Sequence, residues 1–223
     1  MFVKICGVTS EEDALLAVAM DADAVGFNFV AGSPRQIAPQ MARDIARRLP
    51  AEVLTVGIFR DEAPERVVSI VNEAGIRGAQ LHGRESIEAT RYVAERVPFV
   101  IKAFRADDPA VVRADEYGAQ VVMLDGARPG SGETWDWALA AAVPEGVRVL
   151  LAGGLAPENV ADAITAVAPW GVDVASGVER TGGAPGGRKD PRKVRLFVAN
   201  ARAAAPAPAP GPDAIPYDWI DDT

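Results

Sequence analysis

The stretch from Arg148 to Gly177, RVLLAGGLAPENVADAITAVAPWGVDVASG, decides the fold class. Two short apolar runs, Arg148–Ala152 and Val172–Ser176, flank a segment, Pro157–Ala166, in which apolar residues recur at helical spacing. Pro157 suits the first turn of a helix, where a missing N–H is tolerated. Strands that are apolar throughout are typical of a parallel sheet covered by helices. The stretch therefore predicts a strand, a helix and the next parallel strand.

The same unit recurs along the whole chain. Eight apolar runs occur at intervals of roughly 20 to 29 residues, which leaves room for one strand and one helix each. Eight units in about 200 residues favour a closed (β/α)8 TIM barrel as a single domain. An open doubly wound sheet is the alternative, but no G-x-G-x-x-G follows the first run. The predicted strands are Phe2–Cys6, Ala24–Phe29, Val53–Phe59, Gly78–His82, Phe99–Phe104, Gln120–Asp125, Arg148–Ala152 and Val172–Ser176.

Residues that are typical of the first turn of a helix lie between these runs. Thr9 or Ser10 can cap the first helix, whose opening turn carries three acidic residues, 11–13. Prolines stand where two later helices begin, at Pro39 and Pro64. The other predicted helices are Gln40–Leu49, Pro64–Ala74, Ser86–Arg96, Pro109–Tyr117, Pro157–Ala166 and Pro191–Arg202.

The composition excludes several classes of function. The formal net charge of the 223 residues is −8, and a nucleic-acid partner is not expected because it requires a basic face. One cysteine and one histidine form neither a disulfide nor a His/Cys zinc cluster, so we expect no metal and a reducing, cytoplasmic location. The first ten residues do not resemble a signal peptide, and no apolar run approaches about 18 residues, so no membrane association is expected.

Residues 203–223 differ from the rest of the chain. They alternate Ala and Pro, then end with four aspartates and no Lys or Arg. Ala-Pro alternation favours an extended form that buries no core. We therefore expect a barrel over residues 1–202 and a tail over 203–223 that is disordered, or loosely docked through Ile215, Tyr217 and Trp219.

The active site of a (β/α)8 barrel lies at the carboxyl ends of its strands, so residues that end the apolar runs are the candidates. Cys6 ends the first run; a lone cysteine is ordinarily a small buried hydrophobe, but a thiolate there can accept a proton. Asp125 ends the sixth run, and its poorly solvated carboxyl group favours the protonated form that a general acid needs. A loop or helix-capping carboxylate is the alternative for Asp125.

Glycines and a serine follow the last two runs. Gly153 and Gly154 end the seventh run and Ser176 and Gly177 the eighth, where backbone N–H groups can approach a phosphate closely. We expect the segment 177–187 to offer a short helix N-terminus for the same anion. Simple turn formation is the alternative.

Three further polar positions face the same end of the barrel. Arg35 has a forked guanidinium suited to a carboxylate, and Gln80 and His82 share one face of the fourth strand by its period of two. Because the first and eighth strands are neighbours in a closed barrel, we also expect an ion pair between Lys4 and Asp173 inside it.

Short motifs occur in a fixed order at these strand ends. They are KICGVT (4–9), GF (26–27), SPR (33–35), VGIF (56–59), QLHG (80–83), IKA (101–103), LD (124–125), AGGL (152–155), PENV (157–160) and SGVE (176–179). In type and order they resemble the motifs of the phosphoribosylanthranilate isomerases of tryptophan biosynthesis, from Lys4 to about Arg202. Ala175 and Trp135 depart from the pattern, where the family often has Ser and Phe.

The resemblance implies a (β/α)8 fold and an Amadori rearrangement of N-(5-phosphoribosyl)anthranilate without metal or organic cofactor. It implies Asp125 as general acid and Cys6 as general base, with Arg35 at the anthranilate carboxylate. Gly154 and the loop at 176–177 would hold the phosphate, and we hypothesise that Lys4 stabilises the Cys6 thiolate.

Two other functions compete with this interpretation. A bifunctional sugar isomerase of histidine and tryptophan synthesis would carry Asp at position 6 and a second phosphate site, and neither is present in the sequence. A catalytically silent barrel that serves as a partner or scaffold protein is the other, although Cys6 and Asp125 are both present. We expect a small phosphorylated substrate and a monomer rather than a homodimer.

Overall fold

The structure is a computed structural model, and it describes residues 1–126, 134–182 and 186–206. The tail proposed for 203–223 therefore lies outside the described residues from position 207 onward. Among the described helices, none is both long enough and apolar enough to cross a membrane.

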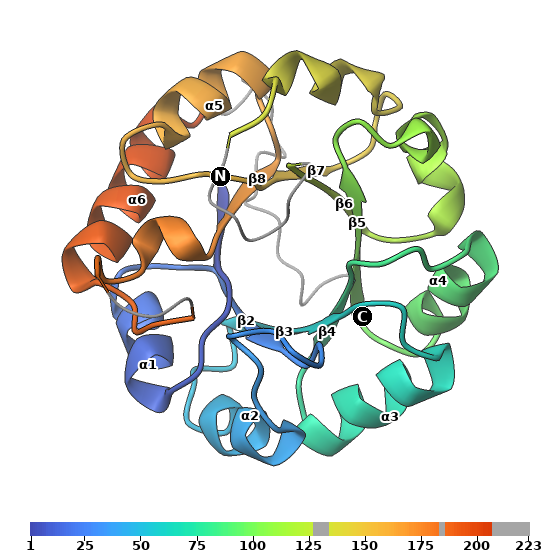
Figure 1. The fold of residues 1–223 in the computed structure, drawn as a ribbon, viewed down its shortest axis with the longest axis horizontal. Coiled ribbons are helices and arrows are strands. Elements are labelled where there is room, and N and C mark those ends of the chain that lie inside the picture. Colours follow the sequence, from blue (N-terminus) through green and yellow to red (C-terminus); the bar gives the residue numbers. More distant parts are fainter. Residues whose placement is uncertain (127–133, 183–185, 207–223) are drawn as a thin grey trace, which may run out of the picture.

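Eight parallel strands form a closed barrel in sequence order, which confirms the predicted architecture (Figure 1). The strands begin and end within one or two residues of the predicted runs. They are β1 (Phe2–Ile5), β2 (Ala24–Asn28), β3 (Leu54–Phe59), β4 (Gly78–Leu81), β5 (Phe99–Arg105), β6 (Val121–Asp125), β7 (Val149–Leu151) and β8 (Gly171–Val174).

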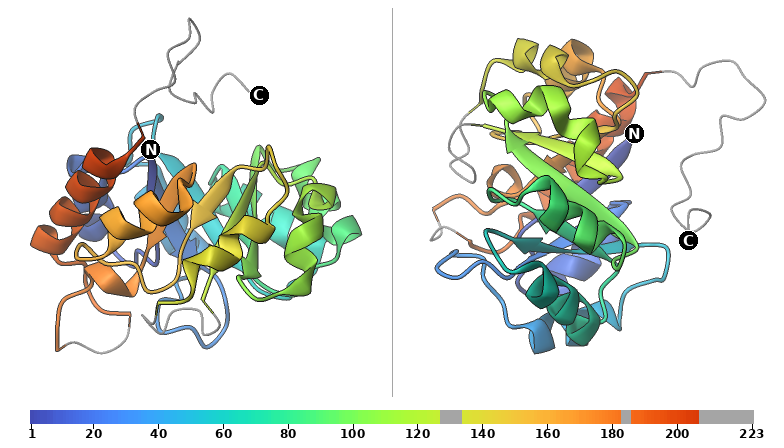
Figure 2. Two further views of the ribbon diagram at one scale, coloured as in Figure 1. Left: turned by 90° about the horizontal axis from the view of Figure 1, so that it is seen from above. Right: turned by 90° about the vertical axis from the view of Figure 1, so that its right-hand side faces the viewer.

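A ring of helices surrounds the barrel, and side views place them outside the strands (Figure 2). The helical elements are α1 (Glu11–Ala19), α2 (Pro39–Ala46), α3 (Pro64–Ala74), α4 (Ile87–Ala94), η1 (Pro109–Tyr117), η2 (Trp137–Ala142), α5 (Val160–Val167), η3 (Ser176–Val178) and α6 (Pro191–Ala204). The three η elements are 3-10 helices.

Two predicted helices differ from the structure. Residues 109–117 form a 3-10 helix in place of an α-helix, with a non-helical residue at Arg113. Helix α5 begins at Val160, not at Pro157. The Asn159 side chain accepts a hydrogen bond from the Ala156 N–H and donates one to the Gly154 carbonyl. This side chain therefore stabilises a turn that delays the start of the helix.

Alternation along the strands sorts the side chains into an inner and an outer set. On β5, Phe99, Ile101 and Ala103 belong to the core inside the barrel, whereas Lys102 has the opposite parity. Lys102 is buried beneath the loop after β4, where its Nζ donates to Glu85 Oε2 at 2.7 Å. The inner set at the carboxyl ends includes the polar residues Lys4, Cys6, Gln80, His82, Asp125 and Asp173.

The first and last strands form the seam that closes the barrel. Residue Lys4 of β1 stands opposite Asp173 of β8, and the two side chains form an ion pair of 2.8 Å, as predicted. At the other end of the seam, Arg202 of α6 donates to the carbonyl of Met1 and to Asp23 Oδ2. The two ends of the barrel sequence are thus joined by side-chain contacts as well as by the sheet.

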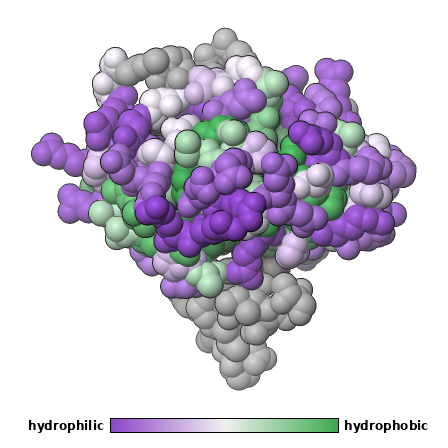
Figure 3. Space-filling model, turned by 90° about the horizontal axis from the view of Figure 1, so that it is seen from below, coloured by the Kyte–Doolittle hydropathy of each residue, from purple (hydrophilic) through white to green (hydrophobic). Residues whose placement is uncertain are grey.

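Hydrophilic side chains cover much of the face that Figure 3 shows. Among the described residues, the large exposed hydrophobic side chains lie on five different helices around the barrel. They are Leu15, Met41, Val112, Leu139 and Leu196.

Candidate active site

A cavity of about 380 Å³ opens at the carboxyl ends of the strands. It contains four of the polar residues that the sequence singled out for chemistry and substrate contact, plus Cys6. Side chains from six strands or their following loops meet there, as expected for this fold. Its polar and ionisable lining includes Cys6, Arg35, Arg60, Gln80, His82, Asp125 and Asp173.

Cys6 lies on the inner face just after β1 and is buried. Its burial raises the pKa of the thiol, which is the largest effect, while Lys4 lowers it through charge and a hydrogen bond. Burial acts to lower the pKa of Lys4, but Asp173 and Cys6 reverse this and the net shift is upward. A raised pKa for Lys4 means that its ammonium group stays charged beside the thiol.

A second lysine, which lies near the carboxyl end of the sequence, also affects the pKa of the thiol. Lys189 is 1% exposed, and its Nζ donates to the Ala175 carbonyl at 3.0 Å and lies 3.4 Å from Glu179 Oε1. Its charge also lowers the pKa of the Cys6 thiol. Burial lowers the pKa of Lys189 and outweighs the opposing effects of Glu179 and Cys6, so the net shift is downward.

Arg35 completes this buried network. Its Nε and Nη2 atoms donate to the two carboxylate oxygens of Glu179 at 2.7 and 3.2 Å. The pairing engages two of the five guanidinium N–H groups, and the side chain lines the cavity. The described cluster thus holds three cations, Lys4, Lys189 and Arg35, and two carboxylates, Asp173 and Glu179.

The absence of a side chain on Gly7 leaves room for the Arg35 side chain beside Cys6. Gly7 follows the thiol with a φ of 69°, in the left-handed region that glycine tolerates. A Cβ on Gly7 would collide with the Cδ of Arg35. The Cys-Gly pair at the end of β1 therefore lets the arginine side chain lie across the strand end.

The surroundings of Asp125, called the acid side of the cavity because the sequence predicts a general acid there, are built differently. Asp125 ends β6 and is 5% exposed, and its Oδ1 accepts a hydrogen bond from the Gly126 N–H at 2.7 Å. His82 Nε2 lies 3.2 Å from Asp125 Oδ2, and Gln80 Nε2 lies 2.9 Å from His82 Nδ1. The sequence placed Gln80 and His82 on one face; the structure brings that face against Asp125.

A small concavity of about 50 Å³ adjoins the main cavity at the ends of β7 and β8. Gly153, with a φ of 86°, packs so closely that a Cβ there would lie 2.8 Å from both Asp125 Oδ1 and Trp135 Nε1. Gly154 and Ser176 line the same concavity, so the structure brings together residues from the two predicted phosphate loops. Gly177 packs against the Leu155 carbonyl beside it.

The expected helix in residues 177–187 is wrong for the part of this segment that the structure describes. Ser176–Val178 forms a single 3-10 turn, and Glu179 then pairs with Lys189 in an antiparallel bridge. Hydrogen bonds between Arg180 N–H and the Arg188 carbonyl continue this pairing. The glycine-rich sequence favours such a returning loop over a helix because glycine lowers helix propensity.

Sequence reasoning missed two members of the network, Lys189 and Glu179. Lys189 stands in an Arg-Lys-Asp-Pro run before a helix, which has the composition of a solvated helix start. Glu179 belongs to the SGVE motif, but no pattern in the sequence pairs it with Arg35, 144 residues away. Only the return of the loop after β8 to the mouth of the barrel brings them together.

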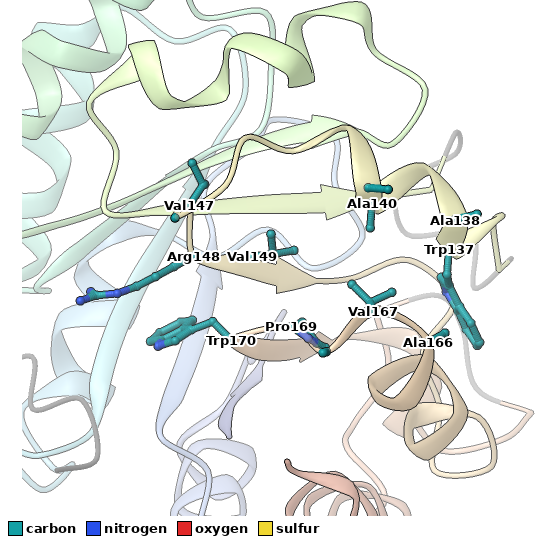
Figure 4. Close-up of a pocket in the computed structure, with 13 residues that line it drawn as sticks. Trp137, Ala138, Ala140, Val147, Arg148, Val149, Ala166, Val167, Pro169 and Trp170 are labelled. Carbon is teal, nitrogen blue, oxygen red and sulfur yellow. The ribbon is translucent and has the colours of Figure 1, made fainter. Parts of the chain in front are cut away.

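A larger cavity of about 520 Å³ lies elsewhere, on the outside of β7 between η2 and α5 (Figure 4). Trp137 and Trp170 stand at opposite ends of this groove, and Val149 and Val167 lie between them. Its lining is mainly Ala, Val, Pro and Trp, with one ionisable side chain, Arg148. The groove lacks the acid and nucleophile pairing found at the strand ends, so it is not the candidate catalytic site.

Known proteins share this fold and sequence pattern. The family model described as N-(5'phosphoribosyl)anthranilate (PRA) isomerase matches residues 3–200. An N-(5'-phosphoribosyl)anthranilate isomerase from Desulforudis audaxviator is 48% identical over 207 residues, which span 90% of this chain and 97% of the relative.

Solved structures agree with the sequence comparison. The crystal structure of phosphoribosyl anthranilate isomerase from Thermus thermophilus has a TM-score of 0.84 and 46% identity, covering 91% of this chain and 99% of that one. A phosphoribosyl anthranilate isomerase in complex with reduced 1-(o-carboxyphenylamino)-1-deoxyribulose 5-phosphate has a TM-score of 0.78 and 38% identity, with 91% and 99% covered. The chain therefore belongs to the N-(5'-phosphoribosyl)anthranilate isomerase family.

Proposed function

We propose that the chain converts N-(5-phosphoribosyl)anthranilate to 1-(2-carboxyphenylamino)-1-deoxyribulose 5-phosphate by an Amadori rearrangement. The observation that carries the proposal is that Cys6 and Asp125 open into one cavity at the strand ends. The reaction moves protons between oxygen, carbon and nitrogen and is redox-neutral overall. It requires an acid and a base in opposite protonation states, and no cofactor.

Asp125 acts first as the general acid. Its proton goes to the ring oxygen of the ribose while the bond from C1′ to that oxygen breaks, which leaves a protonated Schiff base. The Cys6 thiolate then removes the proton from C2′, and the electrons of that bond form the enolamine and neutralise the nitrogen. Loss of the C2′ hydroxyl proton and protonation at C1′ give the ketone.

The remaining site residues bind and orient the substrate. Arg35 pairs with the anthranilate carboxylate through N–H groups that Glu179 does not use. Gly153, Gly154, Ser176 and Gly177 hold the phosphate, and the small concavity at the ends of β7 and β8 supports this placement.

The other polar positions serve the middle of the substrate and the base. Gln80 and His82 line the cavity beside Asp125, where the ribose would lie. Lys4 and Lys189 supply the positive charge that a thiolate needs in a buried position, and both lower the pKa of the Cys6 thiol. The three cations of the cluster exceed its two carboxylates by one charge, which a thiolate balances.

The test is a turnover assay that follows loss of the substrate's fluorescence. The substrate is generated in place from anthranilate and phosphoribosyl pyrophosphate by a transferase. Turnover by the wild type that falls about a hundredfold or more in both Cys6→Ala and Asp125→Asn supports the assignment. A folded but inactive wild type would instead favour the silent partner protein.

We also propose that the chain is a monomer. The exposed large hydrophobic side chains of the described residues lie on different helices, one each, rather than on a single helix face. Stable dimers ordinarily bury larger and more contiguous apolar areas. Light scattering at two protein concentrations tests this, and a mass near twice 23.4 kDa would overturn it.

A further inference from the structure

Two buried polar atoms on the acid side of the cavity lack partners. Gln80 Oε1 and His82 Nε2 are both buried without a hydrogen bond, although His82 Nε2 lies 3.2 Å from Asp125 Oδ2. A buried polar atom without a hydrogen-bond partner is unfavourable, and a second protonation state that uses the atom is one physical explanation for it. One of these atoms is a nitrogen of the imidazole ring, and the other belongs to the amide group whose nitrogen contacts the opposite ring nitrogen.

We propose that His82 and Asp125 act as one acid that shares a single proton, and that Gln80 is the positioning residue that accommodates both states of the ring. The inference rests on the proposed function, because it names the source of the proton that Asp125 delivers. His82 would then do more than contact the ribose.

The geometry defines the state without the shared proton. Gln80 Nε2 donates to His82 Nδ1 at 2.9 Å, so the neutral ring carries its hydrogen on Nε2, toward the Asp125 carboxylate. In this state Gln80 Oε1 has no donor.

When the shared proton is added, Gln80 must accept a hydrogen bond from the ring instead of donating one. The imidazolium ring carries hydrogens on both nitrogens, so Nδ1 becomes a donor and needs an acceptor. Rotation of the Gln80 amide by 180° brings Oε1 to Nδ1 and satisfies it. The other contact of the amide nitrogen is Met123 Sδ at 3.3 Å, a weak acceptor that does not lock the amide in one orientation.

Proton delivery then follows from the same contacts. The Nε2–H bond breaks as the proton moves to Asp125 Oδ2, and its electron pair stays on the ring nitrogen. The carboxyl group passes that proton to the ribose ring oxygen. The ring keeps its remaining hydrogen on Nδ1, where Gln80 Oε1 continues to accept it. The Gly126 N–H, which donates to Oδ1 throughout, holds the carboxyl group in place.

The other charged groups around His82 are paired or more distant. Among the described residues, only Asp125 lies within ion-pair distance of its ring. Arg105 pairs with Asp107, and Asp61 accepts from the Arg84 N–H. The charged side chains that line a cavity together with His82, from its own loop and from the neighbouring elements, are Cys6, Arg35, Arg60, Asp61, Arg84, Arg105, Asp107, Asp108, Asp125 and Asp173.

The chain offers a clean probe, because His82 is its single histidine. Nitrogen-15 NMR of the free, labelled enzyme reports the tautomer of one ring and the pH at which it gains its second proton. In the wild type we expect the neutral ring to carry its hydrogen on Nε2. Two substitutions at one position should then move the midpoint of ring protonation in opposite directions.

Gln80→Glu supplies a permanent acceptor for Nδ1–H, so the doubly protonated ring should persist to higher pH, by about one unit. Gln80→Met keeps the length but removes the acceptor, so the midpoint should fall. The alkaline limb of kcat/KM against pH should move in the same direction as the NMR midpoint in each variant, with KM changed less than kcat.

Gln120→Met is the matched control. Gln120 Oε1 accepts the Val100 N–H at 2.7 Å before β6, at the opposite end of that strand from Asp125. The control should lower stability without moving the midpoint. Midpoints that move in the same direction, or not at all, in Gln80→Glu and Gln80→Met overturn the inference.

The two proposals fail separately in this design. The NMR titration needs no turnover, so an enzyme that is inactive on the substrate leaves its result intact. If Gln80→Met does not fold, Asp125→Asn replaces it, because loss of the carboxylate should also lower the midpoint. Unchanged NMR behaviour in an active enzyme would overturn the shared proton alone.

Discussion

The two sides of the candidate active-site cavity differ in the charged groups that surround them. On the thiol side, Cys6 faces Lys4 and Asp173, and Lys189, Glu179 and Arg35 extend the charged cluster. On the acid side, Asp125 meets one imidazole ring and one backbone N–H. In the proposed mechanism Cys6 must become an anion, and lysines lie beside it, whereas the proposed acid Asp125 faces the titratable imidazole of His82.

Because of this difference, substitutions on the two sides should affect stability and activity in different proportions. Buried ion pairs contribute little net stability, but breaking one by removing a partner is strongly destabilising. Changes on the thiol side should therefore affect folding and activity together. Changes on the acid side should affect activity with smaller effects on folding, because fewer charges lose a partner there.

The largest expected effects come from removing the two groups that we propose as general acid and general base. Asp125→Asn and Cys6→Ala should each lower kcat/KM by about 10² to 10⁴ in the fluorescence assay. Asp125→Asn should leave the midpoint of urea unfolding close to that of the wild type, because it removes no ion pair between permanently charged groups. A variant of either kind that retains more than about a tenth of the activity contradicts the assigned role.

Lys4→Met tests the thiol side next. The substitution leaves Asp173 buried without its cation, so the free energy of unfolding should fall by about 3–5 kcal/mol. Because burial already raises the pKa of the Cys6 thiol, kcat/KM should increase with pH until the thiol ionises. Loss of Lys4 raises that pKa further, so the acid limb should move to higher pH.

Lys102→Met is the control for this substitution. It breaks another buried lysine–carboxylate pair, with Glu85 at 2.7 Å, on the outer face of β5. Its stability loss should be comparable, while the titration of the thiol, followed by its ultraviolet absorbance, should not change. Equal thiol titrations in Lys4→Met and the wild type would exclude Lys4 as the stabilising cation.

Arg35→Lys gives a smaller effect. Lysine does not reproduce the two-pronged contact with Glu179 or a carboxylate, so KM should rise about tenfold with little change in kcat. Arg113→Lys breaks a similar pairing with Glu116 on the surface and should change neither constant. A fall in kcat with an unchanged KM in Arg35→Lys would argue against a role in carboxylate binding.

Trp135→Phe should have the smallest effect. The Trp135 indole donates to the Ala152 carbonyl at 2.8 Å, next to the glycines after β7. Phe fills most of the space without that hydrogen bond, so the free energy of unfolding should fall by about 1 kcal/mol. The kcat should stay within about twofold, since Asp125 keeps its contacts with His82 and the Gly126 N–H. A hundredfold loss would show instead that Trp135 supports the proposed role of Asp125.

The barrel could be predicted because its signal is repeated. Eight apolar runs define eight strands, and closure makes the first and eighth strands neighbours, which was enough to pair Lys4 with Asp173. The period of two along each strand also assigned Gln80 and His82 to one face. These predictions follow from the regular geometry of the strands, so they can be made from the sequence without knowing the course of the loops.

The rest of the site depends on irregular segments. The sequence assigns no course to the loop after β8, which returns to place Glu179 and Lys189 beside Arg35. The same loop replaces the helix expected there, and Asn159 delays the start of α5 through side-chain hydrogen bonds. Such contacts are set by tertiary packing, which local propensity does not encode.

The seam between β1 and β8 has a consequence for the order of folding. Lys4 and Asp173 are 169 residues apart, and Arg202 and Asp23 are 179 apart. Closing so long a segment is entropically unfavourable, so contacts of this separation form late. During synthesis, Cys6 would leave the ribosome early but acquire its charged surroundings only after the last strand and helix have emerged. Catalytic competence would therefore arise in the final step of folding rather than grow with the length of the chain.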